Sequence, residues 1–467
     1  MRARELLSRF DLTEGAQLSA TALATRVAEL IRDGRLPAGV ELPSERDLAG
    51  ALGRSRGTIA RAYEQLRHEG LAYTRHGAGT TVGCCPGPWA SSRAADLVPI
   101  LTSPGTPLPQ MDDAIDLRQV RWEPLPDEAP SMAGDGGQLA SGAASARSEL
   151  LARLARHLHG QGIPAGPDQL LLTGGGTRAL DVVLTTMVRP GERVLVPALT
   201  DPGVLALLRV RGLHPVALPV DREGRADVPG WLQRIRTRSA RIAVVTATHA
   251  TPAGTVLETH ERRLLAEAAA AADVTLIDDA SHTDLWIEEA PPPSLASFDL
   301  DGGDRTITVA STAAMTPAGA SVGWIHTTSD AILERLRAVS ATLDGAPSDP
   351  TVAVARGAFD DHDRMVRHRR QHLIEQTVAA IRQITPAAPH LAISPARGGP
   401  TRWIHVGARP GSAVADAARA RRVLVQPGSA CAVGRADPAA VMVALTGPIE
   451  DLLTGLRLLI AAVHDLG

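Results

Sequence analysis

The stretch GRLPAGVELPSERDLAGALGRSRGTIARAYEQLRHEGLAYTRHGAGTTV, residues 34–82, decides the fold of the first part of this chain. Ser44 is a natural N-cap for a helix over 45–52. Ser55 begins a second helix that continues to about residue 69, and two short strands around a glycine-rich turn follow it. The pattern therefore predicts two helices joined by a short turn and completed by a hairpin.

This arrangement, preceded by an amphipathic helix over 19–33, has the parts of a winged helix-turn-helix, which is a DNA-binding fold. The second helix of the pair would lie in the major groove. There Arg56 can make a bidentate contact to guanine, and the hydroxyls of Ser55 and Thr58 can bond phosphates or base edges. Residues 54–76 contain five arginines and two acids, which gives a net charge of +3. The alternative is a solvated basic helix without function.

The same stretch closely resembles the DNA-binding head of the GntR superfamily. The family pattern is a leucine-proline-serine-glutamate-arginine box, here 42–46, then a serine-arginine-x-threonine recognition helix, here 55–58, and an arginine-x-glycine-x-glycine-threonine wing, here 75–80. The resemblance implies a double-stranded DNA operator as the partner. The predicted DNA contacts are Arg46, Ser55, Arg56, Gly57, Thr58, Arg61, Arg75, His76 and Gly77.

A change of composition separates this head, residues 1–83, from the rest of the chain. Residues 84–114 are rich in Pro, Ser and Ala and lack sustained periodicity, which is typical of an interdomain linker. In the domain over 115–467, short apolar runs alternate with amphipathic helices, and this alternation predicts an α/β fold with a mainly parallel sheet. We expect a large lobe over about 148–328 and a smaller C-terminal α+β lobe over about 329–467.

Four blocks of this domain resemble MocR-type regulators, in which a GntR head is fused to a fold-type I aminotransferase-like domain. Residues 171–203 resemble the phosphate-binding turn with its helix and the next strand, and 244–257 resemble the His-x-x-Pro-x-Gly block. Residues 275–286 resemble the strand that carries the pyridine-binding aspartate. The stretch VASTAAMTPAGASVGW, 309–324, resembles the segment that carries the cofactor lysine. The resemblance implies a homodimer built on this fold.

The position of that lysine falls on Ala314, and the 467 residues contain no lysine at all, so that all 48 residues in the Lys+Arg count are arginines. Pyridoxal phosphate is held in such domains as a Schiff base, which a methyl side chain cannot form. By the same resemblance, the tyrosine that bonds the cofactor phenol falls at Ala280, the ring-stacking aromatic near Asp201 and the phosphate-binding arginine at Ser321. The sequence therefore predicts a degenerate member of the family, with no cofactor and no enzymatic activity.

The surviving parts of the family's pocket are Asp278, at the position that pairs with the pyridine nitrogen, and the glycine-rich turn 173–177. Such a turn at a helix N-terminus can bind an anion through its N–H groups. His249 and His282 lie at the carboxyl edge of the same sheet, where α/β folds bind ligands. The alternatives are a fold relic for the turn and structural roles for Asp278 and both histidines. The predicted effector-binding residues are Gly175, Gly176, Thr177, Asp201, His249, Asp278, His282 and Ala314.

The bulk composition sets further expectations. The sequence has no run of 18 apolar residues and no signal-peptide pattern, so we expect a cytoplasmic protein without a membrane partner. The three cysteines are Cys84, Cys85 and Cys431. The adjacent pair does not have the spacing of a zinc site, and no metal site is predicted.

Three functions remain open. The favoured one is a homodimeric regulator that binds an operator and senses a small molecule other than pyridoxal phosphate. In the second, the large domain only dimerises and spaces two DNA-binding heads. The third is an enzyme of the same fold that works without the lysine; such enzymes carry histidine in its place, whereas this chain has Ala314.

Overall fold

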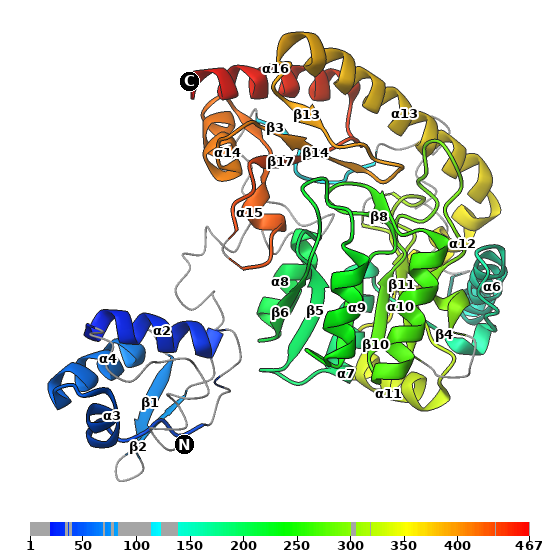
Figure 1. The fold of residues 1–467 in the computed structure, drawn as a ribbon. Helices are drawn as coiled ribbons and strands as arrows, with labels where there is room; N and C mark the ends of the chain where they lie inside the picture. The colour runs from blue at the N-terminus through cyan, green and yellow to red at the C-terminus, as the bar shows by residue number, and fades with distance from the viewer. Residues whose placement is uncertain are drawn as a thin grey trace. The chain divides into compact units, whose positions relative to one another are not determined.

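The computed structural model describes residues 19–32, 36, 40–68, 71–75, 79–82, 114–122, 139–299, 305–317, 319–434 and 436–466. The chain divides into two compact units, one of which contains the N-terminal head (Figure 1). The predicted linker, apart from Ala114, and the adjacent Cys84 and Cys85 lie outside the described residues.

The head is a small α/β unit with three helices and one hairpin among its described residues. Helices α2 (Ala20–Arg32), α3 (Glu45–Leu52) and α4 (Arg56–His68) are followed by strands β1 (Ala72–Arg75) and β2 (Gly79–Val82). The two strands pair antiparallel, with Ala72 opposite Val82. These elements lie where the sequence predicts them, and the hydrophobic stripes of the three helices form one core with Val82.

Local capping fixes the geometry of the two helices that form the helix-turn-helix. The Ser44 hydroxyl accepts a hydrogen bond from the backbone N–H of Asp47 at 3.1 Å, which makes Ser44 the N-cap of α3. Gly53 ends α3 in the left-handed conformation, with a φ of 62°. The buried Tyr63 hydroxyl of α4 donates to the carbonyl of Pro43 at 2.8 Å, and this bond ties α4 to the segment before α3.

The second unit is built around a seven-stranded sheet. The three pairs β10–β11, β10–β7 and β5–β7 are parallel, whereas β12 runs antiparallel to both of its neighbours. The sheet is therefore mainly parallel, as the sequence predicts. The strand order is β4 (Leu170–Thr173), β12 (Gly323–His326), β11 (Thr306–Ser311), β10 (Thr275–Asp279), β7 (Ile242–Val245), β5 (Arg193–Pro197) and β6 (His214–Leu218).

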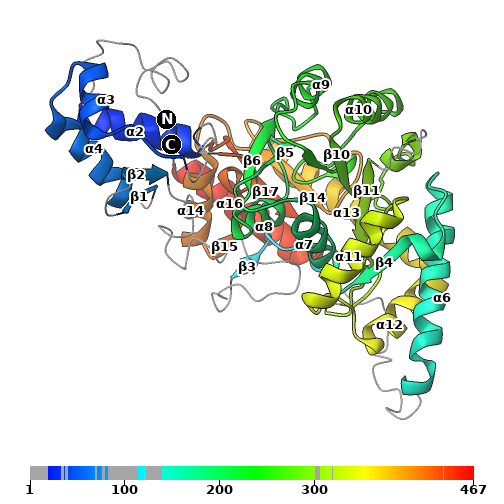
Figure 2. The same ribbon diagram turned by 90° about the horizontal axis from the view of Figure 1, so that it is seen from below.

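Helices cover both faces of this sheet. Figure 2 shows α9 and α10 on one side, and α7 and α11 on the other. The sequence interpretation did not include α9. The helices are α6 (Leu139–Gly160), α7 (Gly176–Met187), α8 (Pro202–Val210), α9 (Val228–Arg236), α10 (Thr259–Ala272) and α11 (Asp330–Thr342), with the short 3₁₀ helices η2 (Pro167–Gln169) and η3 (Leu295–Phe298).

The C-terminal part is an α+β arrangement around a four-stranded antiparallel sheet. The short strand β3 (Ile115–Asp116) pairs parallel with β15 (Val423–Leu424), so that residues at the start of this unit join its C-terminal part. The sheet order is β13 (Ala392–Ile393), β14 (Thr401–His405), β17 (Ala440–Ala444) and β16 (Gln426–Pro427). The helices of this part of the chain are α12 (Asp349–Asp360), α13 (His362–Ala387), α14 (Gly411–Ala420), α15 (Gly428–Cys431) and α16 (Ile449–Asp465). Of these, α12 packs against α6.

Among the described residues, no helix combines the length and the apolar character needed to cross a membrane.

Candidate functional site

The first residues of α4 present polar side chains at the surface of the head. The Ser55 hydroxyl accepts a bond from the backbone N–H of Thr58 at 3.2 Å and lies 2.8 Å from the Thr58 hydroxyl. Arg56 has 76% of its side chain exposed, and its Nε lies 3.2 Å from Glu45 Oε2. The two hydroxyls thus help to cap α4, while the Arg56 guanidinium remains accessible to a partner.

Three further predicted DNA contacts are exposed on the same pair of helices. Arg46 lies in α3, and the Arg61 Nε donates to the Gly57 carbonyl at 3.3 Å. A Cβ at Gly57 would meet nothing closer than the Ser55 hydroxyl at 3.9 Å, so another backbone could approach this position closely. Of the predicted wing residues, Arg75 lies in β1, whereas the predicted contacts at 76 and 77 lie outside the described residues.

The second candidate site lies at the carboxyl end of β10. Asp278 is only 3% exposed, and its Oδ1 accepts a hydrogen bond from the backbone N–H of Ala247 at 3.0 Å. Burial raises the pKa of Asp278 to about 6. The carboxylate therefore links the end of β10 to the segment between β7 and β8 (Thr248–Ala250), which is a structural role.

Arg262 supports the same segment, and the sequence interpretation missed it. This side chain is 0% exposed. Its Nη2 donates to the Ala247 carbonyl at 2.9 Å and to the Thr248 hydroxyl at 2.8 Å, and its Nε donates to the Leu257 carbonyl at 2.8 Å. The signal that could have found it is helical spacing, because Arg262 lies three and four positions before Leu265 and Ala266 on the buried face of α10, whereas its neighbour Arg263 is exposed.

Beside Asp278 lies a group of half-buried polar residues at the same edge of the sheet. The Asp201 Oδ1 accepts from the backbone N–H of Gly203 at 2.7 Å. Burial raises the pKa of Asp201, and the nearby charge of Asp279 raises it further, whereas His282 lowers it. The structure thus brings the predicted residues Asp201 and His282 together and adds Asp279 to them.

His249 has a different environment from His282. It is 1% exposed, has a φ of 55°, and its Nδ1 lies 2.7 Å from the His282 carbonyl oxygen. Burial lowers the pKa of His249 to about 4. A Cβ at Gly398 would overlap the His249 ring, so the ring is enclosed by backbone. These contacts favour a structural role for His249 over a role in binding an effector.

The glycine-rich turn and three serines surround the beginning of α7. Gly175 has a φ of 113°, and Gly176 is the first residue of the helix. A Cβ at Gly176 would lie 3.4 Å from the Ser311 hydroxyl and 3.5 Å from the Ser281 hydroxyl, and one at Gly175 would lie 3.5 Å from the Ser321 hydroxyl. Hydroxyls beside a helix N-terminus are suited to an anion. None of these serines is among the predicted effector residues, because they come from three separate segments; the resemblance named Ser321 only as the position of the phosphate-binding arginine.

Ala314 lies in the segment after β11. Its half-buried methyl group packs against the hydrophobic core of the C-terminal part, and its carbonyl accepts a bond from Arg369 Nε at 2.9 Å. Thr177, the remaining predicted effector residue, lies in the first turn of α7. The predicted residues thus lie on β8, β10, α7 and the loops that follow the strands.

A separate pocket of about 160 Å³ lies between the ends of β5 and β7 and the helix α9. It contains none of the predicted effector residues, and the sequence interpretation did not identify it. Its lining includes Pro197, Trp231, Thr246, Pro252, Leu257 and Glu261.

Comparisons with known proteins match both parts of the chain. Residues 118–452 match aminotransferase class I and II, and residues 4–82 match the bacterial regulatory proteins of the gntR family. The chain is 28% identical over 400 residues to the HTH-type pyridoxine biosynthesis transcriptional regulator PdxR of Corynebacterium glutamicum, covering 81% of each chain. It is 25% identical over 301 residues to the probable rhizopine catabolism regulatory protein MocR of Rhizobium meliloti, covering 58% and 57%.

Aminotransferases are also among the proteins that the chain resembles. The chain is 31% identical over 242 residues to the probable N-succinyldiaminopimelate aminotransferase DapC of Mycobacterium tuberculosis, covering 50% of this chain and 58% of that one. Among solved structures, the α-aminoadipate aminotransferase LysN of Thermus thermophilus aligns with a TM-score of 0.66 at 17% identity, covering 81% of this chain and 98% of that one. The structural likeness shows the fold-type I aminotransferase architecture.

Proposed function

The chain belongs to the aminotransferase class I and II family, and from this premise we propose that it is a homodimeric, DNA-binding transcription regulator that does not carry out aminotransferase chemistry. In this proposal the head binds an operator, and the aminotransferase-like domain senses a small molecule in the cytoplasm. HTH-type transcription regulators are among the chain's relatives, as the pyridoxine biosynthesis regulator illustrates.

The observation that carries the loss of chemistry is the missing amine. The chain contains no lysine, and the aligned position is Ala314, whose methyl group packs against a hydrophobic core. Pyridoxal phosphate supplies its chemistry through a covalent Schiff base, so the residues present do not fit the covalently held group. Asp278 and the turn before α7 persist, but neither can replace an amine.

The proposed effector site is the edge of the sheet beside Asp278. The start of α7, with its three neighbouring serines, is suited to an anionic group, and the carboxylates of Asp201 and Asp279 are suited to a hydrogen-bond donor or a cation. We propose that a small polar molecule bearing both kinds of group binds there. The proposed ligand contacts are Gly175, Gly176, Thr177, Asp201, Asp278, His282 and Ala314.

A second function is an effector-free regulator in which the large domain only dimerises. The internal hydrogen bonds of Asp278 and His249 favour it, because both side chains are satisfied without a ligand.

One experiment tests the loss of the cofactor. The purified full-length protein is incubated with pyridoxal phosphate, reduced with borohydride, digested and examined by mass spectrometry. We expect no pyridoxyl group on any side chain of the wild type. The Ala314→Lys variant is the matched control, because its new lysine would be the only one in the chain. Covalent cofactor on a side chain of the wild type would refute the proposal.

A second experiment tests the regulator and its effector. Genomic fragments that the protein retains are sequenced and footprinted, and small polar metabolites are then screened by thermal shift. A ligand that raises the melting temperature should also change operator affinity, and Asp201→Ala should weaken both effects. A protein that protects no specific DNA would refute the regulator. Operator binding that no metabolite alters would favour the effector-free alternative.

A further inference from the structure

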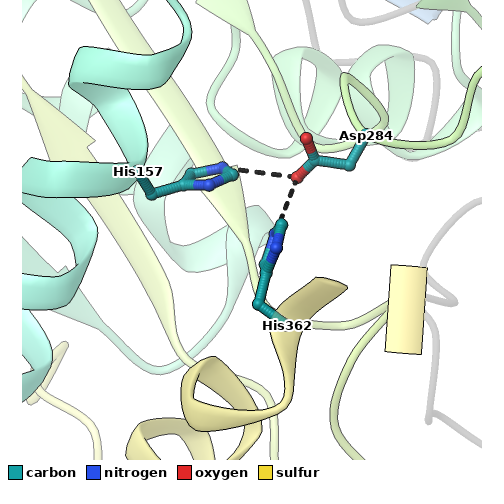
Figure 3. A group of neighbouring side chains, drawn as sticks. All are labelled: His157, Asp284 and His362. Carbon is teal, nitrogen blue, oxygen red and sulfur yellow. Dashed lines mark hydrogen bonds and ion pairs between the residues drawn. The ribbon is translucent and has the colours of Figure 1, made fainter. Parts of the chain in front are cut away.

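Two histidines and an aspartate from distant parts of the sequence meet at one point (Figure 3). His157 lies near the end of α6, Asp284 in the turn after β10, and His362 is the first residue of α13. The Nε2 atoms of His157 and His362 lie 3.3 and 3.4 Å from the same oxygen, Asp284 Oδ2. The three potential ligand atoms lie within 4.8 Å of one another.

We propose that these three side chains bind one divalent transition-metal ion of the Zn²⁺ class. Zinc binds histidine nitrogen and carboxylate oxygen at about 2.0–2.2 Å in tetrahedral geometry, which places neighbouring ligand atoms about 3.4 Å apart. Both nitrogen–oxygen separations here have this length before any ion is present. Two imidazoles and one carboxylate are ligands that zinc accepts.

Neighbouring groups hold the two imidazoles in orientations suited to a metal. The His362 Nδ1 lies 3.1 Å from Asp363 Oδ1, so this carboxylate can accept the second ring proton and leave Nε2 free for the ion. Phe359 stacks on the His362 ring at 5.7 Å and contacts the His157 ring edge-on at 5.8 Å. The rings are therefore held by packing as well as by hydrogen bonds.

Arg370 holds the backbone of Asp284 in place. Arg370 Nε donates to the Asp284 backbone carbonyl at 2.6 Å, and the guanidinium carbon lies 3.7 Å from the centre of the Trp286 ring. The side chains of His157, Asp284 and His362 keep 16%, 29% and 18% of their surface exposed, respectively. An ion can therefore enter from solvent and keep a water molecule as a further ligand.

Gln161 must move to admit an ion. Its amide nitrogen lies 2.9 Å from His157 Nε2 and 3.4 Å from Asp284 Oδ1. A bound metal ion would coordinate the lone pair of His157 Nε2, so the Gln161 amide must turn away from that nitrogen. The competing explanation is a hydrogen-bonded cluster without a metal, in which Asp284 accepts hydrogen bonds from both histidines.

An ion at this position would cross-link three segments of the fold. It would join α6 and α13 to the segment after β10, which also carries His282. The metal site itself does not depend on the proposed regulatory function, because its ligands lie outside the proposed effector contacts.

The test uses the full-length protein with Cys84→Ser and Cys85→Ser, which removes the adjacent thiols as competing ligands. The protein is stripped with a chelator and titrated with Zn²⁺ in competition with a chromophoric chelator. We expect one ion per chain. His157→Ala and His362→Ala should each weaken affinity by more than about 100-fold, which exceeds the loss of about 10–100-fold for a residue that only supports a ligand. His159→Ala, two residues further along α6, should bind as the parent does.

Two measurements separate a ligand from a residue needed for folding. Circular dichroism checks that each variant is folded, and Asp284→Asn retains a hydrogen-bond acceptor of the same shape while losing the charge that holds the ion. Co²⁺ replaces Zn²⁺ as an absorbing probe, and we expect the intense visible bands of tetrahedral cobalt in the parent but not in Asp284→Asn. The absence of stoichiometric Zn²⁺ binding, or unchanged affinity in the folded histidine variants, would overturn the proposal.

Discussion

Arg262 holds together the segments at the carboxyl end of β10 beside Asp278, which we call the polar edge of the sheet. The substitution that tests this role is Arg262→Met. Besides the bonds to Ala247, Thr248 and Leu257, its Nη1 donates to the carbonyls of Pro293 at 2.9 Å and Pro292 at 3.3 Å. Methionine keeps much of the apolar stem and its packing but donates no hydrogen bond.

The expected loss of stability follows from the carbonyl oxygens that lose a hydrogen-bond donor in this variant. The Ala247 carbonyl retains a bond from the Leu257 N–H at 2.9 Å, so the main loss falls on the carbonyls of Leu257, Pro292 and Pro293. A buried acceptor that loses its partner costs about 1–3 kcal/mol. The bond to Leu257 is buried, whereas Pro292 is half-buried and Pro293 is exposed, so that water can replace the donor at these two carbonyls. We therefore expect a loss of about 1–3 kcal/mol in the free energy of unfolding. Removing a buried cation offsets part of this loss.

Denaturant unfolding followed by circular dichroism measures the effect, with Arg263→Met as the matched control. Arg263 is the next residue of α10 and is exposed, so its substitution should change the free energy of unfolding by less than about 0.5 kcal/mol. An Arg262→Met variant as stable as the wild type would show that the cost of burying the guanidinium cancels its hydrogen bonds. That result would refute a stabilising role for Arg262 at the polar edge.

Three further predictions concern the head and the interior. Arg56→Ala should weaken operator binding by about 1–3 kcal/mol in a gel-shift titration while leaving the melting temperature of the head nearly unchanged, because its ion pair is exposed; wild-type affinity would contradict the docking. Burial lowers the pKa of His326 to about 4 from 6.5, so the folded state rejects a proton that the unfolded state binds. The free energy of unfolding should therefore fall as the pH drops from about 6.5 to about 4, and His326→Leu should remove about 3 kcal/mol of that fall while a similar contribution from His249 remains. An undiminished pH dependence in the variant would exclude His326 as a source. Gly398→Ala should destabilise the protein by about 1–3 kcal/mol in denaturant titrations, because its Cβ would overlap both His249 and the Leu285 carbonyl; wild-type stability would show that these neighbours yield freely.

The burial of Asp278 has a physical explanation in the fold. Its carboxylate accepts the Ala247 N–H at 3.0 Å inside the protein. Replacing it by an apolar residue would leave that N–H without its partner in a buried place, at a cost of about 1–3 kcal/mol. Ala314, where the family resemblance places the cofactor lysine, packs its methyl group against apolar neighbours. Asp278 therefore has a structural role that does not require a cofactor.

The sequence predicted most elements because their signals are local. The Ser44 cap, the Gly53 helix end and the hydrophobic stripes of the head depend on residues a few positions apart, and the structure confirms them. The alternation of apolar runs and helices likewise predicted the mainly parallel sheet. The absence of lysine is a fact of composition that no folding can change.

Tertiary structure decided which polar residues meet. The cluster of His157, Asp284 and His362 joins positions more than seventy residues apart, and no spacing rule connects them. The burial of Arg262 rather than Arg263 depends on how α10 turns against the sheet. Local sequence fixes backbone conformation through capping and periodicity, whereas contacts between distant side chains exist only after the packing of helices on the sheet has set their positions.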